Sequence, residues 1–134
     1  MGETAILNTV EEISGINEGL NLACTGLHAE MIRYQNLKDL RGVLNCIHKE
    51  SMSRFTSKQL LEPLFNLFTM NNTIVSHIYV GTDGEYIYYR FKQKIEKIAG
   101  PDFKNMLGEN FVLFKRQDGE WKVWGQLVLM MQPI

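Results

Sequence analysis

The sequence predicts an α+β fold, in which a long N-terminal helix and shorter helices cover an antiparallel sheet of at least four strands. Three observations lead to this prediction. Apolar residues recur at helical spacing over the first third of the chain. Two pairs of segments rich in β-branched and aromatic residues follow. Each pair is joined by an Asp-Gly dipeptide, which is typical of a tight hairpin turn.

The N-terminal segment carries an apolar residue every three or four positions, close to the ~3.5-residue period of a coiled-coil stripe. The stripe consists of Ile6, Val10, Ile13, Ile16, Leu20, Cys24, Leu27, Met31, Tyr34, Leu37, Leu40, Leu44 and Ile47. Its length favours one long helix over a helical hairpin, because no Pro or Asn-Gly interrupts its second half. Gly15, Gly19 and Gly26 each weaken a helix by ~1 kcal/mol relative to Ala, so a kink near them fits the pattern. We expect residues 1–50 to form this helical segment and to offer a surface for a homodimer.

A second helix is expected after the polar run at residues 49–54. Thr56 and Gln59 have the spacing of a capping box, which marks a helix start. Pro63 lies too deep for a first-turn proline, so the helix either begins nearer Glu62 or bends at the proline. The apolar set of this helix is Leu60, Leu61, Leu64, Phe65 and Phe68.

The first hairpin is predicted from segments 74–80 and 86–91, which flank Asp83-Gly84. A two-residue turn there would place Val80 opposite Ile87 and His77 opposite Arg90. One face of the hairpin would then be apolar and belong to the core, carrying Ile78, Val80, Ile87, Tyr89 and Phe91. The other face would be amphipathic and suited to a small polar or anionic ligand, carrying His77, Tyr79, Tyr88 and Arg90.

The rest of the chain predicts two short helices and a second hairpin. The helices are expected at residues 92–99 and 101–108, bounded by Gly100-Pro101 and by Gly108. The hairpin is expected around Asp118-Gly119, between strands at 110–116 and 120–130. Its register stays open, because a two-residue turn would set Lys115 against Lys122 and a bulge would separate these like charges. Trp121 and Trp124 fall on opposite faces of a regular strand, and we include Trp124 in the candidate ligand site.

Composition predicts one domain over residues 1–134, with the helical segment followed by an α+β core at residues 51–134. Fourteen basic and fifteen acidic residues give a net charge of -1, which argues against nucleic-acid binding. No apolar run reaches the ~18 to 20 residues of a membrane span, and the N-terminus lacks a signal-peptide pattern. As written, the chain is expected to be soluble.

Motifs for catalysis or metal binding are missing from the sequence. The three histidines (His28, His48 and His77) are not spaced for zinc or for nucleophilic catalysis. Cys24 and Cys46 would lie ~33 Å apart in one straight helix, too far for a disulfide unless the segment folds back. Two buried thiols are the simpler interpretation. We therefore predict no catalytic residue, metal or cofactor. The candidate ligand site comprises His77, Tyr79, Tyr88, Arg90 and Trp124.

Residues 60–91 resemble the Cache family of ligand-sensing domains, which have a PAS-like core. The resemblance is carried by Asn71-Asn72-Thr73-Ile74-Val75-Ser76-His77-Ile78-Tyr79-Val80-Gly81-Thr82-Asp83-Gly84-Glu85-Tyr86-Ile87, and the ending Leu127-Val128-Leu129-Met130-Met131-Gln132-Pro133-Ile134 is common in that family. It implies a non-catalytic, small-molecule-sensing domain in signal transduction by a histidine kinase or chemoreceptor. Such a domain meets the membrane only through segments absent from this chain. It is extracytoplasmic when excised from a receptor, whereas a full-length protein of this sequence would be cytoplasmic.

The match to that family is incomplete. After Arg90 the chain reads Phe91-Lys92-Gln93, instead of the Arg-x-Trp-Tyr sequence through which many members hold the carboxylate of an amino acid. Amino-acid recognition is therefore not implied. The charge of Arg90 still suits an anionic ligand.

Two other interpretations compete with the sensing domain. The ending Asp118-Gly119-Glu120-Trp121-Lys122-Val123 is similar to the closing hairpin of nuclear-transport-factor-2-like domains, which are small cones that act as enzymes or binding domains. An enzyme of this type would need an acid-base pair inside the cone, and Asp83 and Asp118 at hairpin tips are badly placed for that role. The third interpretation is an interaction scaffold of the roadblock or longin type.

Overall fold

The structure is a computed structural model that describes residues 18–134. The part of the predicted helical stripe that precedes Glu18 lies outside the described residues. Within them the chain forms helices first and an antiparallel sheet second. The elements are α2 (Glu18–Asn36), α3 (Leu40–Asn45), α4 (Ser53–Leu67), β1 (Thr69–Thr82), β2 (Tyr86–Ala99), β3 (Met106–Gln117) and β4 (Glu120–Pro133). The predicted α+β class with four antiparallel strands is confirmed.

The sheet is a simple meander in the order β1-β2-β3-β4. The two short helices expected at residues 92–99 and 101–108 are wrong, because β2 continues to Ala99 and β3 begins at Met106. Residues 92–99 pair with β1 on one side, and the first four of them also pair with β3 on the other, so the ladder hydrogen bonds outweigh the local helical pattern. The two hairpins therefore adjoin directly, without a helical crossover.

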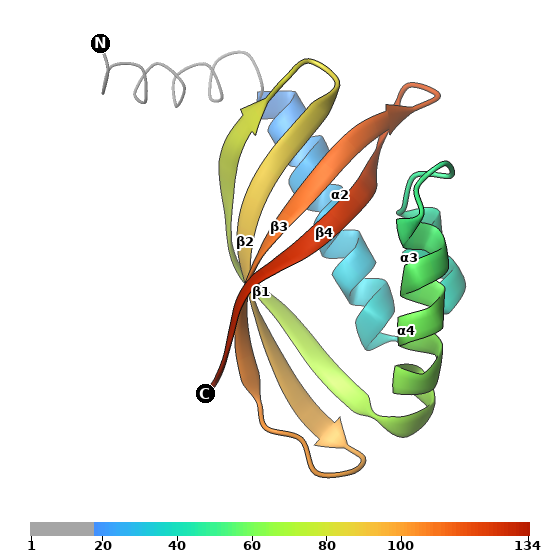
Figure 1. The fold of residues 1–134 in the computed structure, drawn as a ribbon, viewed down its shortest axis with the longest axis vertical. Coiled ribbons are helices and arrows are strands. Elements are labelled where there is room, and N and C mark those ends of the chain that lie inside the picture. The colour runs from blue at the N-terminus through green and yellow to red at the C-terminus, as the bar shows by residue number, and fades with distance from the viewer. Residues whose placement is uncertain (1–17) are drawn as a thin grey trace.

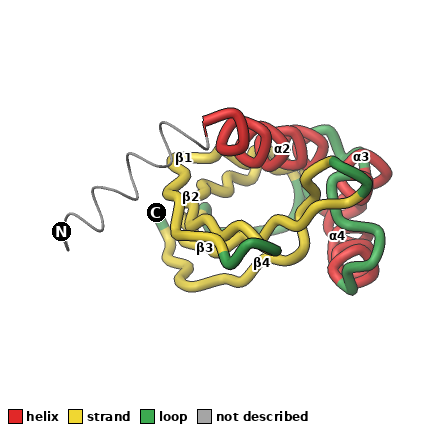
Figure 2. Tube along the Cα trace, turned by 90° about the horizontal axis from the view of Figure 1, so that it is seen from above, coloured by secondary structure: helices red, strands yellow, loops and turns green. Residues whose placement is uncertain are grey.

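The four long strands curl strongly, and α2 lies across the concave side of the sheet (Figure 1, Figure 2). The core fills the space between them. It is made of concave-face residues from the three last strands and of residues from α2, α3 and the segment after α3. The main members are Ile87, Tyr89, Phe91, Val112, Phe114, Val123, Cys24, Met31, Val43, Cys46 and Ile47. Both cysteines are buried and free, and burial raises the pKa of Cys46 to about 11.

A break at residues 37–39 ends α2, so the expected continuous helix through Ile47 is wrong. Lys38 adopts a left-handed conformation with φ of 58°. The Asp39 carboxylate then accepts a hydrogen bond from the backbone N–H of Gly42 at 2.9 Å and caps the start of α3. Shortly after α3, Ile47 pairs with Val123 of β4. The described part of the apolar stripe, from Leu20 to Ile47, thus folds back and packs on the chain's own sheet.

The helix α4 begins at Ser53, earlier than the predicted capping box. Thr56 lies inside the helix, where its hydroxyl donates to backbone carbonyls of the preceding turn, and the Ser51 hydroxyl accepts from the Ser53 N–H instead. Pro63 sits within the helix without ending it. No residue of α4 is fully buried, although Leu61 and Phe65 pack against the core. The helix therefore covers the open side of the curled sheet without closing it tightly (Figure 1).

The register of the first hairpin differs from the prediction, because Thr82 instead of Val80 pairs with Ile87. Tyr79 pairs with Tyr89 and Gly81 with Tyr88, so Val80 is the extra residue of a bulge. His77 and Tyr79 consequently lie on the concave side with Tyr89, and Ile78 points outward with an exposed fraction of 54%. The predicted assignment of β1 residues to the two faces is therefore wrong.

The second hairpin has a two-residue turn, with left-handed Asp118 and Gly119. Lys115 does face Lys122, but their side chains diverge. The Lys122 ammonium donates to the Asn45 carbonyl at 2.9 Å, and Lys115 forms an ion pair with Glu85 at 3.3 Å. These separate partners remove the need for a bulge at this pair.

We predict that Gly42→Ala lowers the free energy of unfolding by ~1 to 3 kcal/mol. An added Cβ would lie 2.4 Å from Cδ1 of the Tyr34 ring, where α2 and α3 meet. Gly26→Ala on α2 is the matched control, because no atom of the described residues lies within 4 Å of its added Cβ. It should raise stability by ~0.5 to 1 kcal/mol through helix propensity. Urea unfolding measures both, and equal effects would contradict the close packing at Gly42.

Candidate functional site

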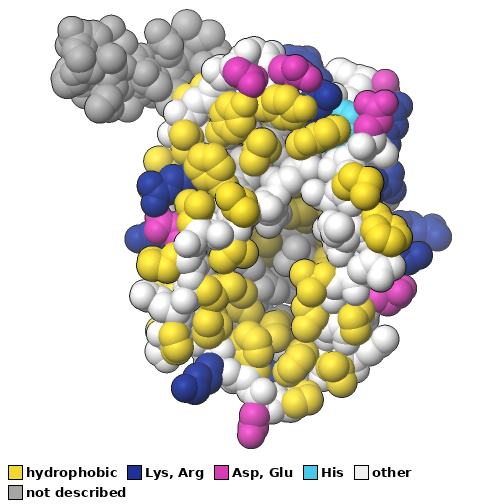
Figure 3. All heavy atoms as spheres, in the orientation of Figure 1, with side chains coloured by type: hydrophobic (Ala, Val, Ile, Leu, Met, Phe, Trp, Pro, Cys, Tyr) yellow, Lys and Arg dark blue, Asp and Glu magenta, His cyan; other side chains and the backbone are white. Residues whose placement is uncertain are grey.

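A cavity of about 360 Å³ lies between α4 and the concave side of the sheet. We call it the cone cavity. Its walls are mainly apolar, with residues from α4, from all four strands and from the loop after β2. They include Leu60, Leu64, Phe65, Phe68, Met70, Ile95, Phe103, Val128 and Met131. In Figure 3 this face of the molecule is hollowed at its centre, hydrophobic side chains surround the hollow, and charged side chains lie towards the periphery.

A second cavity of about 290 Å³ adjoins the cone cavity. The two share Leu60, Leu61 and Val128 in their walls. The second cavity adds hydroxyl groups, but Ser53 donates to the Trp124 carbonyl and Thr56 to its own helix. Of these hydroxyls, the one of Ser53 therefore helps to hold α4 against β4.

Carboxamides provide most of the polar lining of the cone cavity. Asn72 and Gln93 are joined, since the Gln93 amide donates to the Asn72 side-chain oxygen at 2.9 Å. Asn36 fixes this pair from α2: it accepts from the Asn72 backbone N–H at 2.7 Å and donates to its carbonyl. Asn110 is buried and lines the cavity from β3. Among residues 18–134, no Asp or Glu lines either cavity.

A histidine pair connects α2 to β1 inside the core. His28 Nδ1 and His77 Nε2 lie 2.8 Å apart in a hydrogen bond, and the His28 ring packs on Phe91. Burial lowers the pKa of His28 from 6.5 to about 3, and neighbouring His77 adds to the effect. Burial also lowers the pKa of His77. Both imidazoles are therefore neutral at neutral pH.

This histidine pair is separate from the cavities. Neither ring lines the cone cavity or its neighbour, and His28 is completely buried. Among residues 18–134 the Nε2 atom of His28 finds no hydrogen-bond partner, so no described carboxylate orients the pair as in acid-base catalysis. The hydrogen bond between the two histidines instead attaches α2 to β1, the edge strand of the sheet.

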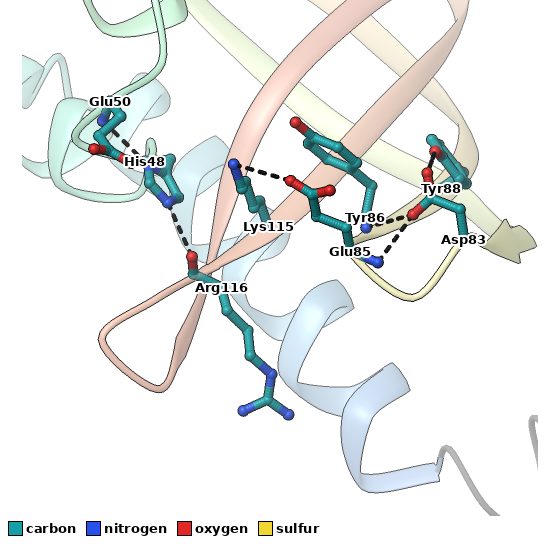
Figure 4. Close-up of polar contacts among 8 residues, drawn as sticks. All are labelled: His48, Glu50, Asp83, Glu85, Tyr86, Tyr88, Lys115 and Arg116. Atoms are coloured by element: carbon teal, nitrogen blue, oxygen red, sulfur yellow. Dashed lines mark hydrogen bonds and ion pairs between the residues drawn. The ribbon is translucent and has the colours of Figure 1, made fainter.

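Three of the five predicted site residues lie on the convex side. The Tyr88 hydroxyl donates to Asp83 at 2.7 Å, and Arg90 pairs with Glu109. The Trp124 ring stacks edge-on with His48 and lies under the Lys115 ammonium at 4.5 Å. Figure 4 shows the neighbouring polar contacts: Asp83 holds the first hairpin turn, and Lys115 reaches Glu85.

The structure therefore does not bring the predicted site together. His77 and Tyr79 point into the core, whereas Tyr88, Arg90 and Trp124 lie on the opposite side of the sheet. The prediction that they share one face is wrong, because the bulge at Val80 reverses the side-chain directions of β1 relative to β2.

Sequence reasoning missed the residues that do line the cone cavity. On β3 the inward positions alternate as Gly108, Asn110, Val112 and Phe114. The sequence did contain one sign of this site: Gly108 and Asn110 occupy inward-facing positions of a strand whose other inward residues are apolar. The contribution of α4 needed its position in space, which periodicity does not provide.

Solved structures with similar folds support a cone-shaped, nuclear-transport-factor-2-like or cystatin-like architecture. A candidate scytalone dehydratase from Novosphingobium aromaticivorans aligns with a TM-score of 0.74 and 11% identity, over 88% of this chain and 89% of its own. A Mycobacterium tuberculosis protein of unknown function aligns with a TM-score of 0.71 and 16% identity, over 87% and 75%. A Nostoc punctiforme protein with a cystatin-like fold gives 0.65 and 9%, over 81% and 88%. At these identities the likeness shows the fold alone.

The sequence profile of the family described as "Anti-sigma-I factor RsgI9, C-terminal domain" matches residues 27–134. A search of curated protein sequences found no match. The resemblance to Cache domains is therefore wrong, and with it the assignment as a PAS-like sensor domain. The hairpin turns and apolar strands that suggested it are common to curled antiparallel sheets.

Two further findings concern the described part of the chain. In residues 18–134 no helix combines the length and the hydropathy that crossing a membrane requires. The same residues contain no group of three or more His, Cys, Asp or Glu side chains arranged for a metal ion.

We predict that acid destabilises the fold through His28. Its pKa is lower in the folded than in the unfolded chain, so the unfolded chain binds more protons below pH ~6.5, and stability is lost as the pH falls towards 3. Between pH 7.5 and 5.0 the loss from this group should be ~2 kcal/mol. Urea unfolding of the wild type and of His28→Leu at both pH values measures it. A variant that keeps the whole pH dependence would contradict the assignment.

Proposed function

Because the chain belongs to the family of the anti-sigma-I factor RsgI9 C-terminal domain, we propose that it is a non-catalytic binding domain of such a protein, with a small-molecule site in the cone. The cone cavity carries this proposal. It is a partly open, mostly apolar space with a few convergent polar groups, which is the usual composition of a small-molecule site.

The chemistry of the lining favours binding over catalysis. Acid-base catalysis needs a group of suitable pKa within hydrogen-bond reach of the substrate. The polar side chains of the cone cavity are carboxamides and the exposed Lys38, and no carboxylate or imidazole of the described residues faces it. The candidate scytalone dehydratase shares only its fold with this chain, so its name is no reason to propose an enzymatic activity.

The position of α4 also supports a binding role. This helix has no fully buried residue, yet its Leu60, Leu61, Leu64 and Phe65 face the cavities. An apolar guest would give these side chains the contacts that they lack. Binding should therefore stabilise the helix against the sheet.

The homodimer expected from the N-terminal stripe is not supported by its described part. Cys24 and Met31 of this stripe are buried in the chain's own core, and Leu27 packs against it. Residues 1–17 lie outside the described residues, so dimerisation through them stays a prediction.

We predict that the neutral fluorescent probe N-phenyl-1-naphthylamine binds in the cone cavity. Its emission should rise with the wild type, and Leu64→Trp should weaken binding by about tenfold or more, because the indole fills the space. Fluorescence titration measures the affinity, and isothermal titration calorimetry checks it independently of Trp emission.

Leu67→Trp is the matched control for this variant. It makes the same change on the same helix, but Leu67 is 57% exposed and does not line the cavity. This control should bind the probe as the wild type does. Equal binding by the wild type, Leu64→Trp and Leu67→Trp would place the probe elsewhere and contradict the proposal.

A further inference from the structure

The Asn110 side chain is a largely buried amide that stays accessible from the cone cavity. It is 8% exposed and, in the described part of the chain, its carboxamide makes no hydrogen bond. Within residues 18–134 the only enclosed side-chain atom without a partner is His28 Nε2, so the amide atoms of Asn110 still reach solvent. A polar group at this depth with no protein partner is a candidate ligand contact. Asn110 lies on the concave side of β3, in phase with the core residue Val112, and lines the cone cavity. Its donor and acceptor are therefore offered to the cavity.

Gly108 keeps space beside this amide. It lies two residues before Asn110 on the same face of β3, opposite Met131 of β4. A Cβ at Gly108 would lie 3.2 Å from Nδ2 of Asn110 and 3.1 Å from Sδ of Met131. Any larger residue at position 108 would therefore press against the Asn110 amide, whereas glycine leaves that side of the amide free.

The other polar groups of the cavity do not compete for the same role. Asn72 and Gln93 are already joined to each other and to Asn36. Gln35 also lines the cavity, from the last turn of α2, but it is less buried than Asn110. Gln126 is exposed, as is Lys38, which is the only charged residue in the lining formed by the described residues. Arg90, which the sequence suggested for an anion, lies on the other side of the sheet in an ion pair with Glu109.

We propose that the cone cavity binds an uncharged, mainly apolar molecule through a hydrogen-bonding group that Asn110 anchors. This inference rests on the proposed function and adds the class of ligand and the residue that selects it. A carboxamide donates and accepts, so it complements a neutral group that does both, such as an amide or a hydroxyl. A buried carboxylate would lose its hydration without gaining a cation at Asn110, and the cavity should reject it.

Three probes of one shape test the class of ligand: 2-naphthamide, 2-naphthoate and 2-methylnaphthalene. Isothermal titration calorimetry at pH 7.5 should show the wild type binding 2-naphthamide about tenfold more tightly than either of the others, as one anchored hydrogen bond provides. Asn110→Leu, which conserves size, should lose this preference while it still binds 2-methylnaphthalene. Asn71→Leu, at an exposed position of β1 outside the cavity, is the matched control and should keep the preference.

Gly108→Ala provides a second variant that leaves the amide in place. Its methyl group should displace the Asn110 carboxamide and reduce the preference for 2-naphthamide, with circular dichroism confirming the fold. Together the two variants separate the amide itself from the space around it.

The outcomes distinguish this inference from the proposed function. Binding of 2-naphthoate as tightly as 2-naphthamide, or an unchanged preference in Asn110→Leu, would overturn the inference alone. A wild type that binds N-phenyl-1-naphthylamine in the cavity but not 2-naphthamide would do the same. Failure of all four compounds to bind would overturn the proposed function as well.

Discussion

The curvature of the sheet is the constraint on which the rest of the structure depends. Four long antiparallel strands form a meander, and bulges in β1 and β4 bend it. A sheet bent in this way has a concave side too deep for one helix to fill. The helix α2 and the short α3 pack into one part of it and build the core there (Figure 2). The remaining part stays open beneath α4, and the cone cavity is the result.

The concave side thus has a filled part and an open part, and the helices are attached differently at the two. At the closed part, α2 is held by buried apolar residues and by the contact of His28 with His77. The segment after α3 adds strand-like hydrogen bonds to β4 through Val123. Within residues 18–134 the helix α4 is held by half-buried side chains and by Ser51 and Ser53, whose hydroxyls donate to the Trp124 carbonyl. Its attachment is therefore the weakest in the fold, which suits an element that covers a binding cavity.

The sequence was sufficient to predict the elements that depend on residue type and spacing alone. Both Asp-Gly turns, the apolar helical stripe and the α+β class follow from residue types alone. The sequence was insufficient where a single residue changes which face of the sheet other residues occupy. Val80 forms a bulge that no local pattern marks, and this bulge moves His77 and Tyr79 to the opposite face from the one predicted. Residues 92–99 have helical propensity, and only pairing with β1 and β3 makes them a strand.

The candidate site was harder to predict because it is made of ordinary residues in an unusual place. Asparagine at position 110 is unremarkable in the sequence, and it becomes informative only when its strand is known to face inward. Charge follows the opposite distribution: the ion pairs Arg90–Glu109 and Lys115–Glu85 lie on the convex side, and Lys49–Asp118 is near the second hairpin turn. Charged groups thus stabilise the outside of the sheet, where water solvates them, and the cone is left with amides and the exposed Lys38. A cavity with neutral donors and acceptors selects a guest by hydrogen-bond geometry and shape instead of by charge. For this reason a residue such as Arg90, which the sequence makes conspicuous, is the wrong guide to what the cone binds.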